Sequence, residues 1–412
     1  MAGNQQKGKI FILFAITGIY WIFWSMLRPI VALYLNSYGL SAGTIGMILS
    51  LQTLLPFIFA MPIGKWIDRI GVRTAVLGGA AILTGSMFFF IMSDWLQWYA
   101  VSIAGLFIIG IGSLLTWGSL QAAATKMAII DFPENKNKLI SNFSFINSVT
   151  QFAGPSLGGV LLEHRGYGTT FVVLFGLVIL ILLLAPRLSR EASPDQPGAP
   201  QPMGMWTNLW GSYKEGFMLI KQNHVFAISV LMSAILFGLI DLRATFFPIY
   251  LDEHGYSESR IGFLLSAGAL ATILVRPVTA YLLERLHLIG LCVGSIVIGG
   301  LCLASLLFQP GYAVLLVIVI FWAFATGINQ PVSLIMSANS LRKDQQGLGA
   351  SVRQMANRSV EFINPALFGM VAGMIGLSLS FALTGGLLAV FGAVFMLWDR
   401  SKRQKRGIEG DA

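Results

Sequence analysis

The sequence predicts an all-α membrane protein with twelve transmembrane helices arranged as two related halves. Of its 412 residues, 56% are hydrophobic and only 11% are charged, whereas a soluble domain carries roughly 25% charged residues. The charged residues gather between long apolar runs, so they cannot cover a water-exposed surface. A hydrocarbon core about 30 Å thick requires about 20 apolar residues per helix. The runs are too long for the strands of a barrel, so the chain spans the membrane as helices.

Twelve segments have the length and hydrophobicity of membrane-spanning helices. Polar residues interrupt the fifth and the eleventh. The first is too long for the apolar core of a signal peptide and lacks a cleavage site before the next span, so we expect it to be retained. The expected spans are 10–35, 44–63, 74–93, 97–125, 140–162, 168–186, 224–251, 260–283, 288–308, 311–336, 349–373 and 377–398.

Lysine and arginine lie almost entirely on one side of this topology. Only Arg165 and Arg260 fall in loops on the other side, and a few arginines lie within spans; the rest of the 27 basic residues share the side of both termini. The positive-inside rule places that side in the cytoplasm. We therefore expect a multi-pass protein of the cytoplasmic membrane with both termini cytoplasmic. Because the basic residues are spread over many short loops, the net charge of +9 does not indicate nucleic-acid binding.

The sequence contains no recognisable catalytic, metal-binding or nucleotide-binding motif. Cys292 and Cys302 share one apolar span without metal or redox spacing, and the four histidines form no ligand motif. We therefore expect neither an enzyme nor an ATP-driven pump, and no metal or cofactor. The expected partners are a small-molecule substrate, protons and membrane lipid, with a monomer as the working unit.

A long polar connection divides the spans into two sets of six. Residues 187–223 include a proline-rich stretch that cannot hold a regular helix; this gives an N-terminal half at 1–186, a C-terminal half at 224–399 and a basic tail at 400–412. The halves match in one register, with a shift of 216 residues. The shift places Tyr34, Leu35, Gly39, Ser41, Ile45 and Gly46 on Tyr250, Leu251, Gly255, Ser257, Ile261 and Gly262. Two such parallel repeats resemble the major facilitator architecture, whose substrate site lies between the halves near the middle of the membrane.

The loop between the second and third spans carries the charged cluster GKWIDRIGVRT. It resembles the major facilitator loop motif G-x-x-x-D-R-x-G-R-R, with Val72 in place of one basic residue. In that family the motif is a cytoplasmic latch between the halves that breaks when access switches. A loop that only obeyed the positive-inside rule would need basic residues but not this glycine spacing. The resemblance implies the latch role for Gly64, Asp68, Arg69, Gly71 and Arg73.

The fifth span contains GPSLGG, which is similar to the antiporter motif G-P-x-x-G-G of drug/proton exporters in the same family. Small residues allow close helix packing, and the proline bends the span. The resemblance favours export over import, although a kinked packing helix is the structural alternative. INPALFG, at 363–369, occupies the equivalent place in the second half. The motif residues are Gly154, Pro155, Gly158 and Gly159.

The fourth span departs from that branch of the family. It keeps Gly110 and Gly112 but lacks the arginine that drug/proton antiporters usually carry there. The usual proton relay therefore cannot be assigned, and the coupling ion stays open at this stage. Trp21, Trp24 and Trp117 either stack on a ligand or serve as ordinary packing aromatics.

Ionisable residues within spans are costly and usually face a cavity or a partner. Span eleven is the most polar, because Gln354, Asn357, Arg358, Glu361 and Asn364 share one helical face. Within it, Arg358 and Glu361 are spaced to pair, either as part of a substrate site or as a structural ion pair. Arg353 lies near a helix end, where its side chain can reach the interface. The residues expected to line the substrate or proton pathway are Arg28, Asp241, Arg243, Arg276, Asn329, Gln330, Gln354, Asn357, Arg358 and Glu361.

The deep arginines outnumber the deep carboxylates, which predicts a cavity for anionic or zwitterionic solutes. Arg358 is the first choice to contact the substrate, and Asp241 and Glu361 are the candidate proton carriers. The expected function is proton-coupled export of a small amphiphilic or anionic/zwitterionic solute by alternating access. The alternatives are a dedicated exporter of a metallophore or other anionic metabolite, a proton symporter for uptake, and a receptor or scaffold that transports nothing.

Overall fold

The computed structural model describes residues 2–128, 132–188, 207–342 and 345–410. Within the helices, the side chains of 2–7, 60–66, 68–69, 207–213, 397–410 and a few single positions lie outside the described part. The described chain is almost entirely helical. Its α-helices are α1 (Ala2–Ser37), α2 (Ala42–Ile70), α3 (Val72–Trp95), α4 (Ala100–Lys126), α5 (Lys136–Leu184), α6 (Thr207–Gln222), α7 (His224–Glu253), α8 (Glu258–Arg285), α9 (Leu288–Ser305), α10 (Tyr312–Ser340), α11 (Gln346–Ile375) and α12 (Leu377–Gly410).

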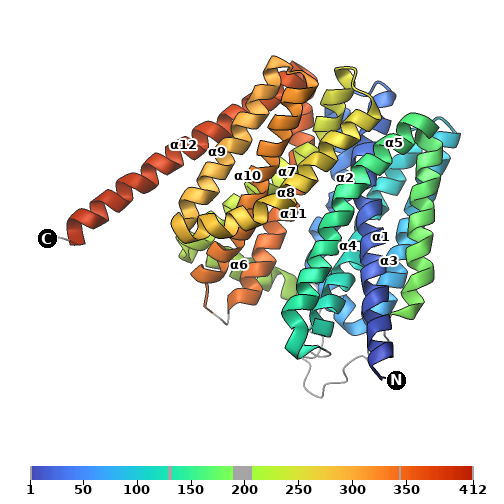
Figure 1. The fold of residues 1–412 in the computed structure, drawn as a ribbon, viewed down its shortest axis with the longest axis horizontal. Coiled ribbons are helices and arrows are strands. Elements are labelled where there is room, and N and C mark those ends of the chain that lie inside the picture. Colours follow the sequence, from blue (N-terminus) through green and yellow to red (C-terminus); the bar gives the residue numbers. More distant parts are fainter. Residues whose placement is uncertain (1, 129–131, 189–206, 343–344, 411–412) are drawn as a thin grey trace.

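The described helices confirm the expected two sets of six spans (Figure 1). Ten segments are long and apolar enough to cross a membrane. One of them, Lys138–Arg187, holds two spans, because α5 bends at Gly166, where φ is +73°. The remaining span is α11, which is long enough to cross a membrane but carries too many polar residues to count among the ten apolar segments.

Two boundaries differ from the sequence prediction, and one that separates two spans within a single long helix agrees with it. Spans 140–162 and 168–186 are the two parts of α5, and the bend at Gly166 separates them where the prediction placed a break. After the prolines, the linker forms α6, and the Asn223 side chain then caps α7 by accepting from the Phe226 N–H at 3.0 Å. The last span continues as α12 to Gly410 instead of ending at 398, because the Lys, Arg and Gln residues beyond it are good helix formers.

The turns between spans lie on two sides of the bundle. We call the side that holds the N-terminus and α6 the basic side, because most of the lysines and arginines lie there (Figure 1). The opposite side, which we call the closed side, holds the turns at 38–41, 96–99, 254–257, 309–311 and 376.

The internal repeat is visible in the turns of the closed side. Gly39 and Gly255, which the shift of 216 residues superposes, have φ values of +68° and +75°. A glycine adopts this left-handed conformation without the steric cost that other residues incur. In each half, a serine then marks the start of the next helix, Ser41 before α2 and Ser257 before α8. The two halves therefore share local turn chemistry as well as span number.

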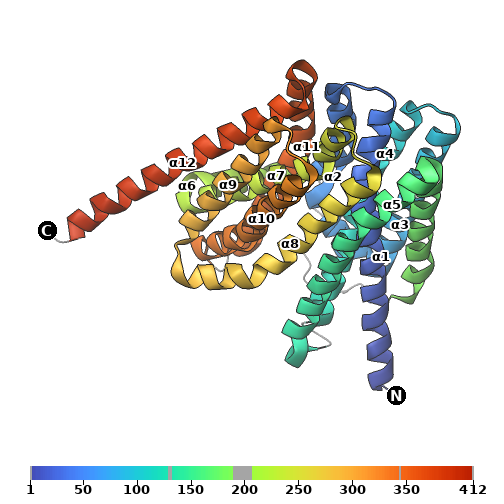
Figure 2. The ribbon, with the colours of Figure 1, turned by 45° about the horizontal axis from the view of Figure 1, so that its top comes forward.

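The halves contact each other through three pairs of helices. α2 packs on α11, α5 packs on α8, and α1 meets α7; the meeting of α5 and α8 is clear in both ribbon views (Figure 2). In the described parts of the chain, neither α4 nor α10 packs extensively on the opposite half. The ribbons of the halves diverge towards the basic side (Figure 1). The structure is therefore joined at the closed side.

Candidate functional site

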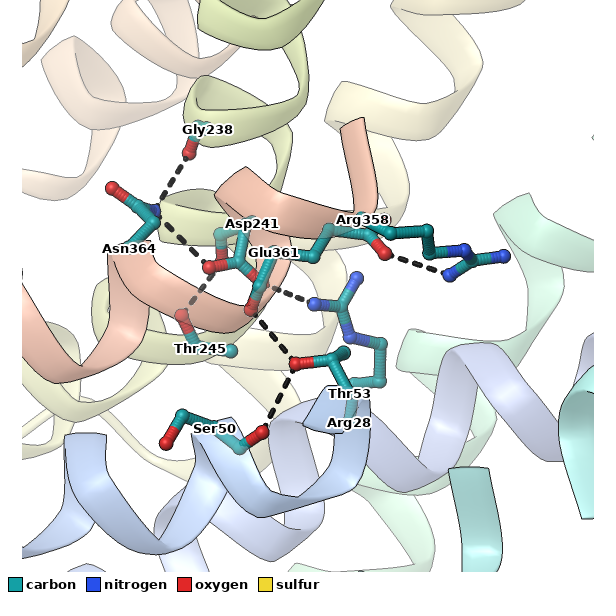
Figure 3. Close-up of polar contacts among 9 residues, drawn as sticks. All are labelled: Arg28, Ser50, Thr53, Gly238, Asp241, Thr245, Arg358, Glu361 and Asn364. Carbon is teal, nitrogen blue, oxygen red and sulfur yellow. Dashed lines mark hydrogen bonds and ion pairs between the residues drawn. The ribbon is translucent and has the colours of Figure 1, made fainter. Parts of the chain in front are cut away.

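Three helices bring polar side chains together at the junction of the two halves (Figure 3). Arg28 on α1 forms an ion pair with Asp241 on α7 through Nη2 and Oδ1. Asn364 on α11 donates from Nδ2 to the other carboxylate oxygen of Asp241 at 3.1 Å and to the Gly238 carbonyl at 3.3 Å. Both oxygens of Asp241 therefore have partners, and one partner comes from the opposite half.

The Arg28–Asp241 pair is shielded from water. The side chain of Asp241 is 2% exposed and that of Arg28 is 18% exposed. Removing one partner of a buried ion pair costs about 3–5 kcal/mol, because the other charge is left uncompensated. The pair thus links the halves strongly as long as both charges are present, and neutralising Asp241 would weaken the link.

The second deep ion pair lies within one helix. Arg358 Nη1 contacts Glu361 Oε2 at 2.7 Å, three residues along α11, and the two side chains are 25% and 13% exposed. From the opposite half, Thr53 Oγ1 on α2 donates to the backbone carbonyl of Glu361 at 3.1 Å. Arg358, our first choice for a substrate contact, therefore already has a carboxylate partner, as the structural alternative expected.

The polar stripe on α11 divides between several neighbours. Asn357 accepts a hydrogen bond from Ser233 Oγ on α7 at 2.9 Å, and Asn364 also faces α7. Gln354 is exposed. The stripe is therefore largely a contact with α7, and only part of its surface is open.

The other two deep arginines differ in their partners. Arg276 on α8 donates from Nη2 to Ser148 Oγ on α5 at 3.0 Å, across the two halves. Arg243 lies on a different face of α7 from Asp241, beside Gly268 of α8, and its buried Nη1 has no hydrogen-bond acceptor among the described residues. Arg276 is exposed and bonds a neutral hydroxyl, whereas Arg243 has a buried donor that no described residue satisfies.

The remaining predicted positions lie outside this cluster. Asn329 on α10 is buried and donates to the Cys292 carbonyl at 3.4 Å, whereas the neighbouring Gln330 is exposed. In the predicted latch, Gly71 has φ +80°, which suits the tight turn between α2 and α3. Arg73 is partly exposed. The side chains of Gly64, Asp68 and Arg69 lie outside the described residues.

The antiporter-like motif presents two faces of α5. Gly154 and Gly158, one turn apart, pack on α1 within the first half, where a Cβ would meet Ser25 or Ile30. Pro155 and Gly159 form the other face and pack on α8 of the second half. A Cβ at Gly159 would overlap the carbonyl oxygen of Glu258, and one at Gly262 would overlap that of Pro155. The two backbones are therefore in direct contact there.

The repeat-related segments make the same contact on the other flank. A Cβ at Gly46 on α2 would overlap the carbonyl oxygen of Pro365 on α11, and one at Gly369 would lie 2.5 Å from the Ala42 carbonyl oxygen. Pro365 and Gly369 belong to the INPALFG segment, and Gly46 is the repeat mate of Gly262. We call these two places, where glycines bring the backbones of α5 and α8 or of α2 and α11 into contact, the glycine crossings. They join the two halves at equivalent positions of the repeat.

Two polar contacts at the closed side were not predicted from the sequence. Asn36 Nδ2 on α1 donates to Asp252 Oδ2 on α7 at 2.8 Å, and Glu163 Oε2 on α5 accepts from the Ser259 N–H at 2.9 Å. Asn36 and Asp252 are separated by 216 positions, so they are equivalent residues of the two repeats. Equivalent residues can meet where they lie near the axis that relates the halves, and the repeat register could therefore have predicted this contact. Nothing in the sequence marks Glu163.

Aromatic rings form a stack inside the first half. The Tyr20 ring lies parallel to Trp24 and to Trp117, with centroid separations of 6.2 and 5.9 Å. Trp117 in turn stacks on Phe143 at 5.9 Å. The Tyr20 hydroxyl bonds Ser113 Oγ at 2.7 Å. These contacts account for packing between α1, α4 and α5, and the partly exposed tryptophans also offer a ring surface.

Comparisons with known proteins agree with this architecture. A family model described as Major Facilitator Superfamily matches residues 13–365. The MFS-type transporter SLC18B1 of Mus musculus is 22% identical over 93% of this chain and 84% of its own length. Multidrug resistance protein 2 of Bacillus subtilis is 20% identical over 97% of both chains.

Solved structures give the same result for the fold. The crystal structure of the nucleoside transporter NupG superposes with a TM-score of 0.76 at 13% identity, covering 94% of this chain and 98% of that one. At such low identity the likeness concerns the fold alone. The family model, however, covers most of the sequence. The chain therefore belongs to the Major Facilitator Superfamily and is a multi-pass membrane transporter, not an enzyme.

Proposed function

We propose that the protein exports a small amphiphilic solute with an anionic or zwitterionic group in exchange for protons, by alternating access between its halves. The observation that carries this proposal is the buried Arg28–Asp241 ion pair between the halves. The antiporter-like motif at the α5–α8 crossing and the multidrug resistance relatives support export.

The described state fits one step of this cycle. With the basic side in the cytoplasm, the halves are joined on the outer side and diverge towards the cytoplasm. Asp241 and Arg28 are in contact, which favours an ionised carboxylate. This is the inward-facing form that has released its proton and accepts cargo.

The opposite state would separate the two charges. When the halves part on the outer side, Asp241 loses Arg28 and faces water that is continuous with the outside, where it takes up a proton. The return step re-forms the ion pair only after that proton leaves towards the cytoplasm, because a neutral carboxyl group cannot neutralise Arg28. One proton thus enters in each cycle, and cargo leaves in the opposite half of the cycle.

Transport by purified protein in proteoliposomes tests the proposal. We expect a pH gradient to drive accumulation of the zwitterionic probe norfloxacin, while a sodium gradient of equal size does not. Asp241→Asn should abolish gradient-driven accumulation but leave exchange of labelled for unlabelled probe, since exchange needs no proton step. Accumulation that follows sodium, or that survives in Asp241→Asn, contradicts the proposal.

A further inference from the structure

Arg243 has no acceptor for a buried N–H donor. Arg28 has Asp241, Arg358 has Glu361, and Arg276 has Ser148. The Nη1 atom of Arg243, by contrast, is buried without any hydrogen-bond partner among the described residues. An ionised group in such a place is costly unless an opposite charge or an acceptor completes it.

A second unpaired donor lies on the same seam. Trp322 on α10 is 0% exposed, and its Nε1–H also lacks an acceptor in the described chain. The Trp322 ring contacts Phe247, one turn from Arg243 on α7, with centroids 5.6 Å apart. Both donors therefore lie where α7 and α10 meet.

The third helix of the seam comes close to the guanidinium. A Cβ on Gly268 of α8 would lie 3.4 Å from Arg243 Nη1 and 2.9 Å from Val319 Cγ1, one turn before Trp322. The absence of a side chain at Gly268 therefore lets α8 pack closely against Arg243 and Val319. α7, α8 and α10 together present two N–H donors, one of them charged, and no carboxylate from the described residues.

The chemistry of these donors selects the ligand. A carboxylate has only acceptor atoms when ionised, and its two oxygens match the paired N–H groups of a guanidinium. The indole N–H of Trp322 is the second unsatisfied donor, from the α10 side. A neutral amide would bring its own N–H groups into a site that already has only donors.

We propose that Arg243, with Trp322, forms the subsite that binds the carboxylate of the cargo, in the seam between α7, α8 and α10. The inference rests on the proposed function in one respect, that the cargo carries an anionic group. It moves the principal anion contact from Arg358, which Glu361 neutralises, to an arginine that lacks a counter-ion.

Binding to the purified, detergent-solubilised protein tests this subsite without requiring transport. The probes are 1-naphthoate and its neutral isostere 1-naphthamide, measured by calorimetric titration. We expect the wild type to prefer the carboxylate and Arg243→Gln to weaken its binding about 10- to 100-fold, the usual contribution of a charge-assisted hydrogen bond. Trp322→Phe, which keeps a ring but loses the donor, should weaken it about 2- to 10-fold. Binding of 1-naphthamide should change little in either variant.

A stability measurement separates ligand binding from a structural role. Without ligand, Arg243→Gln should melt at the same temperature as the wild type or higher, because the substitution removes an uncompensated charge. Arg260→Gln, at an exposed arginine beside Tyr312 near the closed side, is the matched control and should keep the wild-type preference.

Three results would overturn the subsite. These are equal binding of both probes by the wild type, a preference that persists in Arg243→Gln, and a lower melting temperature of that variant without ligand. A carboxylate preference that depends on Arg243, found together with transport that ignores the pH gradient, would support the subsite and remove only the proton coupling.

Discussion

The two places where the halves meet are built from different chemistry. At the closed side, glycines bring backbone against backbone in the α5–α8 and α2–α11 crossings. Nearer the middle of the spans, Arg28 and Asp241 join α1 to α7 through opposite charges. The crossings rely on shape, whereas the centre relies on a specific pair of ionised groups.

This difference indicates which contact can act as a switch. When the glycine crossings separate, they lose mainly van der Waals contacts, and each pair of contacting atoms contributes only about 0.1–0.2 kcal/mol. When Arg28 and Asp241 separate, each buried charge loses its partner unless a proton or a group of the cargo takes the place of that partner. In the proposed cycle, the crossings close the outer side tightly, and the partner of each charge in the Arg28–Asp241 pair decides when closure is favourable.

The largest effect is expected from breaking the central ion pair. Arg28→Gln should lower the free energy of unfolding by about 3–5 kcal/mol and abolish transport, because Asp241 is left buried and ionised. The double variant Arg28→Gln with Asp241→Asn should recover most of the stability but not the proton-driven transport. Thermal unfolding in detergent and uptake into proteoliposomes measure the two effects.

Recovery of stability is the decisive observation in this experiment. If the destabilisation of the double variant equalled the sum of the two single effects, the two residues would contribute independently, and the central pair would not differ in kind from the glycine crossings.

A smaller effect is expected from single methyl groups at the crossings. Gly46→Ala and Gly159→Ala should each disfavour the joined form by about 1–3 kcal/mol, the usual cost of overpacking a close contact. A cysteine introduced at Ser156, which faces α8 at the crossing, should then react faster with an impermeant maleimide added from outside. The native cysteines Cys292 and Cys302 are both buried, so the background labelling is low.

Gly176→Ala is the matched control for these substitutions. A Cβ at Gly176 meets nothing within 4 Å, so labelling at position 156 should stay at its wild-type rate. An increase as large as that in Gly159→Ala would mean that the crossings do not hold the outer side closed.

The pair within α11 should matter less than the pair between the halves. Arg358→Gln and Glu361→Gln each remove a contact that is local to one helix and less buried than the Arg28–Asp241 pair; pairs of this spacing on helix surfaces contribute about 0.3–0.5 kcal/mol. We expect a loss of about 1 kcal/mol or less in each variant, and access to a cysteine at position 156 should not change. A destabilisation as large as that of Arg28→Gln would place both pairs in one network.

Most of the fold could be predicted from the sequence, because the membrane restricts it so strongly. Apolar length determines the spans, and one register of 216 residues determines the pairing of the halves. The break between the fifth and sixth spans was predicted at 163–167, whereas the helix α6 was not predicted. The prolines of the linker predict an irregular segment, and that prediction was extended to the residues after them, where α6 forms.

The site was predicted less completely, for a physical reason. The sequence shows that Arg28, Asp241 and Arg358 are deep, but not which charge meets which. Asp241 and Arg243 are two positions apart, so they face different helices, and only the packing of α1 and α8 assigns their partners. Tertiary contacts such as that of Thr53 with the Glu361 carbonyl involve a backbone atom and leave no mark in the sequence.

The smallest effect concerns the polar rim of a glycine crossing. Glu163 on α5 accepts from the Ser259 N–H in the first turn of α8, where a negative charge also interacts favourably with the helix dipole. Glu163→Gln keeps an oxygen for the hydrogen bond and removes only the charge, and exposed charges are screened by salt. We therefore expect a slight rise in maleimide labelling at position 156, one that disappears as salt is added. A rise independent of salt, or as large as in Gly159→Ala, would show that this carboxylate holds the crossing together, and closure of the outer side would then depend on charge as the centre does.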